Sequence, residues 1–149
     1  DLLELAAVPT EGGLGRVGVL AEPVTVSAFV ARAARVLRTP WGVRATGDPR
    51  RVIGSVAVCG GAGGSLLDDV RHLGADLYLT GDLRHHGVDE SLRAGGPVLA
   101  DAGHWATEYP WCAAAATLIG AETGLPADCH ETPTDPFTIH HGTSPDGCA

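Results

Sequence analysis

Residues 55–82, SVAVCGGAGGSLLDDVRHLGADLYLTGD, decide the fold class that this sequence predicts. The apolar run at 55–59 predicts a short strand, and the spaced leucines and valine of 66–73 predict a helix. Gly74 ends that helix, and the apolar residues of 76–80 predict the next strand. Strand, helix and strand at this spacing indicate two parallel strands joined by a crossover helix.

The same alternation extends along both flanks of that stretch. The further elements that the pattern predicts are strands over 16–20, 98–101 and 127–131, a helix from residue 25 or 27 to about 38, a helix over 88–94, and a helix from about 107 or 110 to 122. The sequence therefore belongs to the α/β class, with a mainly parallel or mixed sheet covered by helices.

The chain is expected to divide into three parts. Residues 1–15 are expected to be a linker from a missing N-terminal half, 16–137 the α/β unit, and 138–149 a loose tail. The sequence contains no Met, so Asp1 is expected to be a processed, trimmed or cut end.

Composition excludes several classes of protein. With 44% hydrophobic and 19% charged residues the chain is globular, and no apolar run approaches the ~20 residues that span a bilayer. The net charge of −8 argues against nucleic acid as a partner. The four cysteines form no Cys-x-x-Cys pair, which favours a reducing cytoplasm over a disulfide scaffold.

Charge is unevenly distributed along the chain. Residues 76–149 contain eleven acids, two arginines and six of the seven histidines, which gives this half a net charge of −9. Such a half offers ligands to divalent cations, and a solvated acidic face is the alternative interpretation.

Three predicted strands are each followed by a segment that is rich in glycine or in histidine and acidic residues. These segments are residues 60–65, 80–86 and 101–108. In an open α/β sheet, function collects at the carboxyl ends of the strands. We therefore expect the candidate site where these three segments meet.

The glycine-rich segment has two interpretations. In one, the amides of Gly61, Gly63 and Gly64, with Ser65 capping the next helix, cradle a phosphate. In the other, they form a tight turn that packs a helix on a strand. The segment lacks the last glycine of G-x-G-x-x-G, and no Lys follows it as in a P-loop.

The spacing of His104 and Glu108 predicts a pair that aims at one point, since one helical turn separates them. Imidazole and carboxylate are good ligands for Zn, Mn or Fe. The alternative is an ordinary helix N-terminus, where Glu108 complements the helix dipole and His104 donates to a backbone carbonyl.

Asp82, His85 and His86 form a third group. Adjacent histidines point in different directions on most backbones, so one of the two is expected to face the site. Metal ligation, support of a metal ligand and general acid–base catalysis are the roles open to this group, and a polar surface loop is the alternative.

Four motifs together resemble a known family: residues 56–65, VAVCGGAGGS; 74–82, GADLYLTGD; 103–108, GHWATE; and 134–137, TDPF. Their order and spacing resemble the Nif-three-like dinuclear metal-centre hexameric proteins, also called GTP cyclohydrolase 1 type 2 homologues. The likeness covers nearly the whole chain and about half of that family's domain.

The resemblance implies one half of a two-half α/β fold with a two-metal site between the halves. It implies that His104 and Glu108 are the ligands that this half gives to two divalent ions (Zn, Mn or Fe), that the other half brings an adjacent His pair and an Asp, and that Asp82 and His86 line the catalytic site. It also implies a homo-oligomer, a hexamer in the complete protein, that acts on a small nucleotide-like substrate. In the implied hydrolysis, metal-activated water opens a purine ring or cleaves the nucleotide, with the triphosphate toward the glycine amides.

Two other functions remain open. One is a non-catalytic, metal-binding and regulatory assembly protein that stores or senses ions. The other is a Rossmann-like nucleotide binder without metal, although its glycine fingerprint is broken here.

Overall fold

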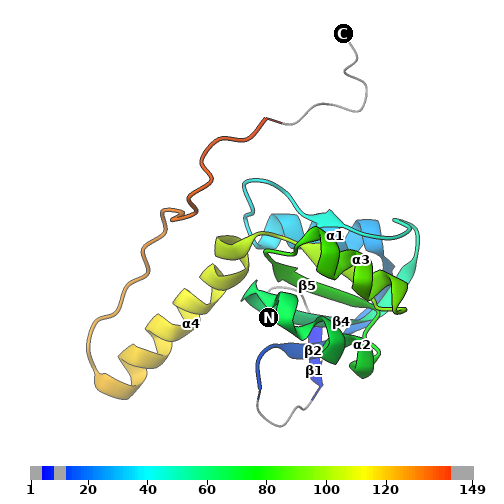
Figure 1. Ribbon diagram of the computed structural model, residues 1–149. Coiled ribbons are helices and arrows are strands. Elements are labelled where there is room, and N and C mark those ends of the chain that lie inside the picture. The colour runs from blue at the N-terminus through cyan, green and yellow to red at the C-terminus, as the bar shows by residue number, and fades with distance from the viewer. Residues whose placement is uncertain (1–4, 9–12, 142–149) are drawn as a thin grey trace.

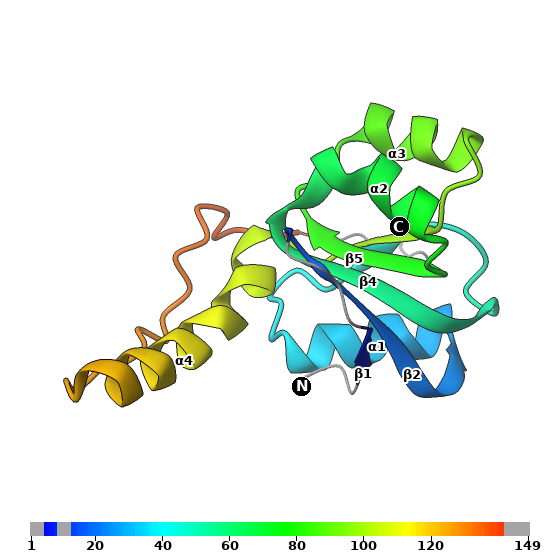
Figure 2. The ribbon, with the colours of Figure 1, turned by 90° about the horizontal axis from the view of Figure 1, so that it is seen from below.

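The computed structural model describes residues 5–8 and 13–141, and within them it places one mixed sheet with helices on both faces (Figures 1 and 2). The strands are β1 (Leu5–Val8), β2 (Arg16–Thr25), β3 (Arg44–Ala45), β4 (Val52–Ala62), β5 (Leu77–Gly81) and β6 (Val98–Asp101). The helices are α1 (Val26–Val36), α2 (Leu67–Leu73), α3 (His85–Arg93) and α4 (His104–Thr123), and a 3-10 turn, η1 (Gly63–Leu66), precedes α2.

The order of strands across the sheet is β1-β2-β4-β5-β6-β3. The central strands β4, β5 and β6 run parallel, whereas β1, β2 and β3 each pair antiparallel with their neighbours. The prediction of an α/β protein with a mainly parallel or mixed sheet is confirmed, and the sheet is mixed. Because the three central strands are parallel, their carboxyl ends meet at one edge.

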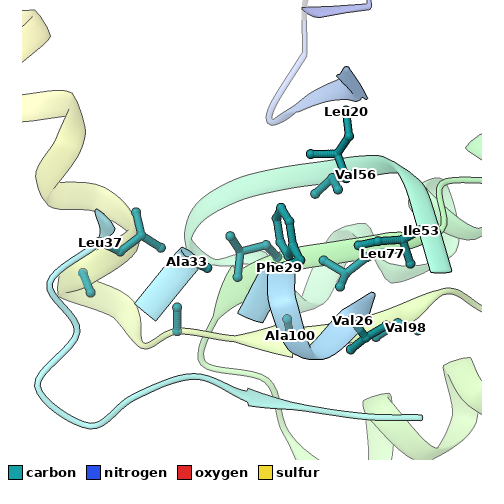
Figure 3. Packing of buried hydrophobic residues seen from close by; sticks show 13 residues of the cluster. Leu20, Val26, Phe29, Ala33, Leu37, Ile53, Val56, Leu77, Val98 and Ala100 are labelled. Carbon is teal, nitrogen blue, oxygen red and sulfur yellow. The ribbon is translucent and has the colours of Figure 1, made fainter. Parts of the chain in front are cut away.

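Helix α1 covers one face of the sheet, and Figure 3 shows its side chains directed at the strands. Phe29 and Ala33 are fully buried against a cluster that includes Val56 and Leu77. Burial of a side chain the size of Phe29 contributes about 1.5–3 kcal/mol. The helix begins where predicted, because Thr25 Oγ1 accepts a hydrogen bond of 3.2 Å from the Ala28 amide.

Helices α2 and α3 cover the other face (Figure 2). On this face, Val70 of α2 and Ala75, which lies between α2 and β5, belong to one buried cluster with Tyr78 and Leu99 of the strands. The sequence pattern predicted that Leu73 would share this buried face, but Leu73 is 62% exposed. It is the last residue of α2, and the left-handed Gly74 (φ 69°) then turns the chain away.

Two sequence-based expectations differ from the observed elements. The segment 1–15, expected to be a linker, contains β1, which pairs antiparallel with β2. Residues 127–131, expected to be a final strand, contain no strand, because α4 carries the chain away from the sheet and β3 occupies the edge beside β6. The division at residues 16–137 and 138–149 stays a prediction.

Helix α4 extends beyond the body of the sheet (Figures 1 and 2). Of its residues Ala106 is buried, whereas Trp111 is 65% exposed. Trp105 and Tyr109, one turn apart, stack with ring centroids 4.7 Å apart. Across the described part of the chain, none of the helices has the length and apolar character needed to cross a membrane.

Asp76, the residue directly before β5, should make the stability of the protein depend on pH. Partial burial by itself raises the pKa of Asp76, but hydrogen bonds from the Gly54 amide and from the Ser55 amide and hydroxyl, with the charge of Arg51, lower it overall. A carboxylate whose pKa is lowered by folding stabilises the folded protein at pH values above its pKa in the unfolded chain. This stabilisation is lost as the pH falls through the pKa of the folded state.

We therefore expect Asp76→Asn to reduce the free energy of unfolding at pH 7 and to matter progressively less below about pH 4. Urea unfolding of both proteins between pH 7 and pH 2 measures this difference. If the difference in free energy of unfolding between the two proteins stays constant over that pH range, the ionised carboxylate does not have this role.

Candidate functional site

The candidate site lies where the carboxyl ends of β4, β5 and β6 meet. Strand β4 ends in Gly61 and Ala62, Asp82 follows β5, and β6 leads through Gly103 into His104 at the start of α4. The parallel sheet thus joins segments that are more than 20 residues apart in the sequence, as the three predicted strand ends indicated.

His104 has a carboxylate at each ring nitrogen. Its Nδ1 lies 2.6 Å from Asp82 Oδ2, and its Nε2 lies 3.2 Å from Glu108 Oε2. Because a carboxylate only accepts hydrogen bonds, Nδ1 carries the proton and donates to Asp82. Asp82 thereby fixes the ring orientation and directs Nε2 toward Glu108.

The two carboxylates also control the charge of His104. The hydrogen bond to Asp82 raises the pKa of His104, desolvation opposes this, and the negative charges of Glu108 and Asp82 raise it further. The protonated ring is thus favoured to a higher pH than in an isolated histidine. A metal ion binding at Nε2 displaces this proton.

Gly61 leaves space beside this pair. A Cβ at Gly61 would meet Glu108 Oε1 and would lie 3.3 Å from His104 Nε2, so a larger residue would fill the point where the two donors converge. The backbone here is fixed on both sides. The Gly61 amide donates to Thr107 Oγ1 at 2.9 Å, and Thr80 Oγ1 donates to the Gly61 carbonyl at 3.1 Å.

The chemistry of these donors fits a divalent cation. An imidazole nitrogen and a carboxylate facing one open point suit Zn, Mn or Fe, and the second carboxylate on Nδ1 is the usual support of a metal-bound histidine. Among the residues that the structure describes, no group of three or more His, Cys, Asp or Glu side chains is arranged to hold a metal. His104 and Glu108 are thus two candidate ligands rather than a complete set.

The predicted residues of the glycine segment have different surroundings. The Gly61 amide already donates a hydrogen bond to Thr107 Oγ1. The Gly63 carbonyl oxygen accepts a hydrogen bond of 3.0 Å from Tyr78 Oη. Burial raises the pKa of Tyr78 to about 12, so this hydroxyl stays a donor at neutral pH. Gly64 and Ser65 are exposed in η1, and the predicted Ser65 cap is wrong, because α2 begins without a side-chain cap. The phosphate cradle stays a prediction.

The structure brings Asp82 to the site but leaves His86 outside it. His85 and His86 form the first turn of α3, where both are exposed and their rings meet edge-on at 5.5 Å. His85 lines a separate cavity of about 240 Å³, together with Arg44, Leu83 and Asp101 among others. A catalytic role for His86 stays a prediction.

A cavity of about 520 Å³ opens beside His104 and Glu108. The residues that line it are Trp41, Asp82, Gly103, His104, Trp105, Glu108, Thr134, Asp135, Pro136, Phe137, Ile139 and His140. The TDPF motif therefore lies at the site. Sequence reasoning missed Trp41, which belongs to no motif; its ring centroid lies 5.0 Å from that of His140 in the cavity wall.

Fold and site together define an α/β protein with a histidine–carboxylate pair at the carboxyl edge of a mixed sheet. The family described as Duf34/NIF3 (NGG1p interacting factor 3) matches residues 2–136. The chain belongs to this Duf34/NIF3 family, as the four motifs suggested.

Two relatives and one solved structure illustrate the likeness. The chain is 48% identical over 144 residues to a Streptomyces coelicolor protein and 44% identical over 149 residues to a Mycobacterium tuberculosis protein, both named GTP cyclohydrolase 1 type 2 homolog. These alignments cover 92% and 98% of this chain, but 50% and 39% of the relatives. A Bacillus cereus protein related to NIF3 superposes with a TM-score of 0.72 at 26% identity, over 86% of this chain and 36% of that one. The chain thus spans half or less of these proteins.

Proposed function

We propose that this chain supplies His104 and Glu108 to a dinuclear divalent-metal centre, and that the complete protein is a metal-dependent hydrolase of a nucleotide-like substrate. The observation that carries the proposal is the convergence of His104 Nε2 and Glu108 Oε2 at Gly61, 3.2 Å apart. The remaining ligands come from outside the described residues.

Each residue of the site has a distinct task in this proposal. Asp82 holds the proton on Nδ1 of His104, so that Nε2 keeps its lone pair for the ion. Glu108 provides a negative charge that offsets the charge of the cation. Bound divalent ions lower the pKa of water and polarise a substrate oxygen. Gly61 keeps the space in front of the pair free of protein atoms.

The cavity supports a substrate with a planar ring. Trp41, Trp105 and Phe137 line the cavity beside His104 and Glu108, and aromatic side chains can stack on heterocycles. The names of the Streptomyces and Mycobacterium relatives point to GTP as the first nucleotide to test.

The proposal also includes a hexamer in the cytoplasm. The exposed apolar residues Trp111, Leu118 and Ile119 of α4 suit burial in an assembly. Cys59, Cys112 and Cys129 are free thiols, as a reducing compartment favours.

A second candidate is a non-catalytic, metal-binding assembly protein. The position of His86 favours it, because this expected catalytic group is exposed on α3 and does not line the cavity at His104. Assays of GTP ring opening by the full-length protein with added Mn, Fe or Zn separate the two. Tight metal binding without turnover supports the second candidate.

We expect His104→Ala to remove most of the bound metal from the full-length protein, because the variant loses one ligand of a small set. Elemental analysis of the purified protein measures this loss. His72→Ala is the matched control, since His72 lies on α2 and its Nδ1 contacts the Asp68 carbonyl oxygen of the same helix at 2.7 Å. Equal metal content in the His104 variant and the control would refute the ligand assignment.

A further inference from the structure

We infer that Arg44 and Asp101 are positioning residues that hold the Asp82–His104 pair in its metal-binding geometry. This inference rests on the proposed function of that pair. It adds two residues that neither the motifs nor the ligand chemistry includes.

The carboxylate of Asp101 joins three separate segments. Asp101 ends β6 and is 9% exposed. Its Oδ2 accepts hydrogen bonds from the Leu83 amide at 3.1 Å and from Arg44 Nη2 at 2.6 Å and Nε at 3.1 Å. Its Oδ1 accepts from the Gly103 amide at 3.0 Å.

The two amides that Asp101 binds are adjacent to the site residues. Leu83 directly follows Asp82, and Gly103 directly precedes His104. Asp82 has a φ of 56° and Gly103 a φ of 83°, both in a region that side chains rarely adopt. One carboxylate therefore fixes the backbone on both sides of the 2.6 Å contact between Asp82 and His104.

Arg44 completes the arrangement from the edge of the sheet. It pairs with Asp101 in the β3–β6 register, and its Nη2 also donates to the Leu83 carbonyl at 2.9 Å. The guanidinium thus binds the loop after Asp82 and the carboxylate that orders this loop. A lysine has the charge of Arg44 but not its planar fork of donors.

The Arg93–Asp89 pair on α3 provides a contrast. Its 2.8 Å contact joins two residues one turn apart on the same helix. The two arginines are similarly exposed, but Asp89 is 48% exposed whereas Asp101 is 9% exposed. Pairs of this kind contribute little to a fold. Arg93→Ala is therefore a matched control that removes an arginine–aspartate pair without touching the site.

The test uses the full-length protein and Zn²⁺ as the probe, titrated against a competing chelator. We expect Arg44→Ala to weaken Zn²⁺ binding by about tenfold, as loss of the groups that orient metal ligands does. Arg44→Lys should show most of the same loss of Zn²⁺ affinity. Arg93→Ala should bind Zn²⁺ as tightly as the parent protein does. Hydrogen–deuterium exchange should show faster exchange across residues 82–84 in both Arg44 variants.

A purely structural role for Arg44 gives a different result. If Arg44→Ala lowers the melting temperature but leaves Zn²⁺ affinity and exchange across 82–84 unchanged, the inference is overturned. Full recovery of affinity in Arg44→Lys also overturns it, because charge alone would then suffice.

Failure of the proposed function is distinguishable from failure of the inference. If His104→Ala binds Zn²⁺ as tightly as the parent protein, the proposed function fails whatever the Arg44 variants do. The exchange measurement then decides the inference alone. Faster exchange across 82–84 supports Arg44 as the group that positions Asp82, and unchanged exchange refutes it.

Discussion

Gly61→Ala is expected to weaken divalent-metal binding by the full-length protein at least about tenfold, comparable to loss of the groups that orient metal ligands. The new Cβ would meet Glu108 Oε1 and approach His104 Nε2 within 3.3 Å. Glu108 must then swing away, and the two donors no longer converge. The left-handed φ of 68° adds about 1 kcal/mol of backbone strain for alanine.

Gly74→Ala is the matched control for this experiment. Gly74 has a φ of 69°, so alanine experiences the same strain, but a Cβ there would meet nothing within 4 Å. Both variants should lose about 1 kcal/mol of stability from the φ angle, while Gly61→Ala alone loses affinity for Zn²⁺. If Gly61→Ala binds Zn²⁺ as the control does, the metal does not bind between His104 and Glu108.

Gly81→Ala is expected to lower the free energy of unfolding by about 3 kcal/mol, because overpacking in a rigid interior costs this much. Gly81 is buried at the end of β5, and a Cβ there would lie 2.7 Å from the Gly103 carbonyl oxygen and 3.0 Å from the Gly61 carbonyl oxygen. Both neighbours are backbone atoms, so relief requires the ends of β4 and β6 to move apart.

Gly87→Ala provides the control for Gly81→Ala. Gly87 lies within α3, and its nearest neighbour, Leu67 Cδ1, would be 3.4 Å from the added methyl group. Alanine in a helix interior is more favourable than glycine by about 1 kcal/mol, so this variant should unfold at the same or a higher urea concentration. Equal destabilisation of the two variants would contradict the close approach at Gly81.

The central part of the fold was predictable because its signals are local. Residues 55–82 combine a buried strand, glycines and an apolar-faced helix, and the observed β4, α2 and β5 follow that order. The edge strands were not predictable in this way. The two residues of β3 form a strand through pairing with β6, a contact across 57 residues that no local pattern encodes.

The same distinction applies to the candidate site. His104 and Glu108 were found from their spacing of one helical turn, and Asp82 from its position after a strand. Arg44 gave no signal, since its contact with Asp101 depends on the tertiary fold. The choice between His85 and His86 also depended on where α3 begins, and α3 begins at His85 itself.

Pro110 interrupts the backbone hydrogen bonds of α4 between the proposed ligands and the outer half of the helix. It lies inside α4, one turn beyond Ala106, and has no amide hydrogen to donate to the Ala106 carbonyl. The turn that holds His104 and Glu108 is packed against the sheet, whereas the later turns are exposed. Because this hydrogen bond is missing, we expect α4 to bend more easily at Pro110 than elsewhere, between the turn that holds His104 and Glu108 and the exposed outer turns.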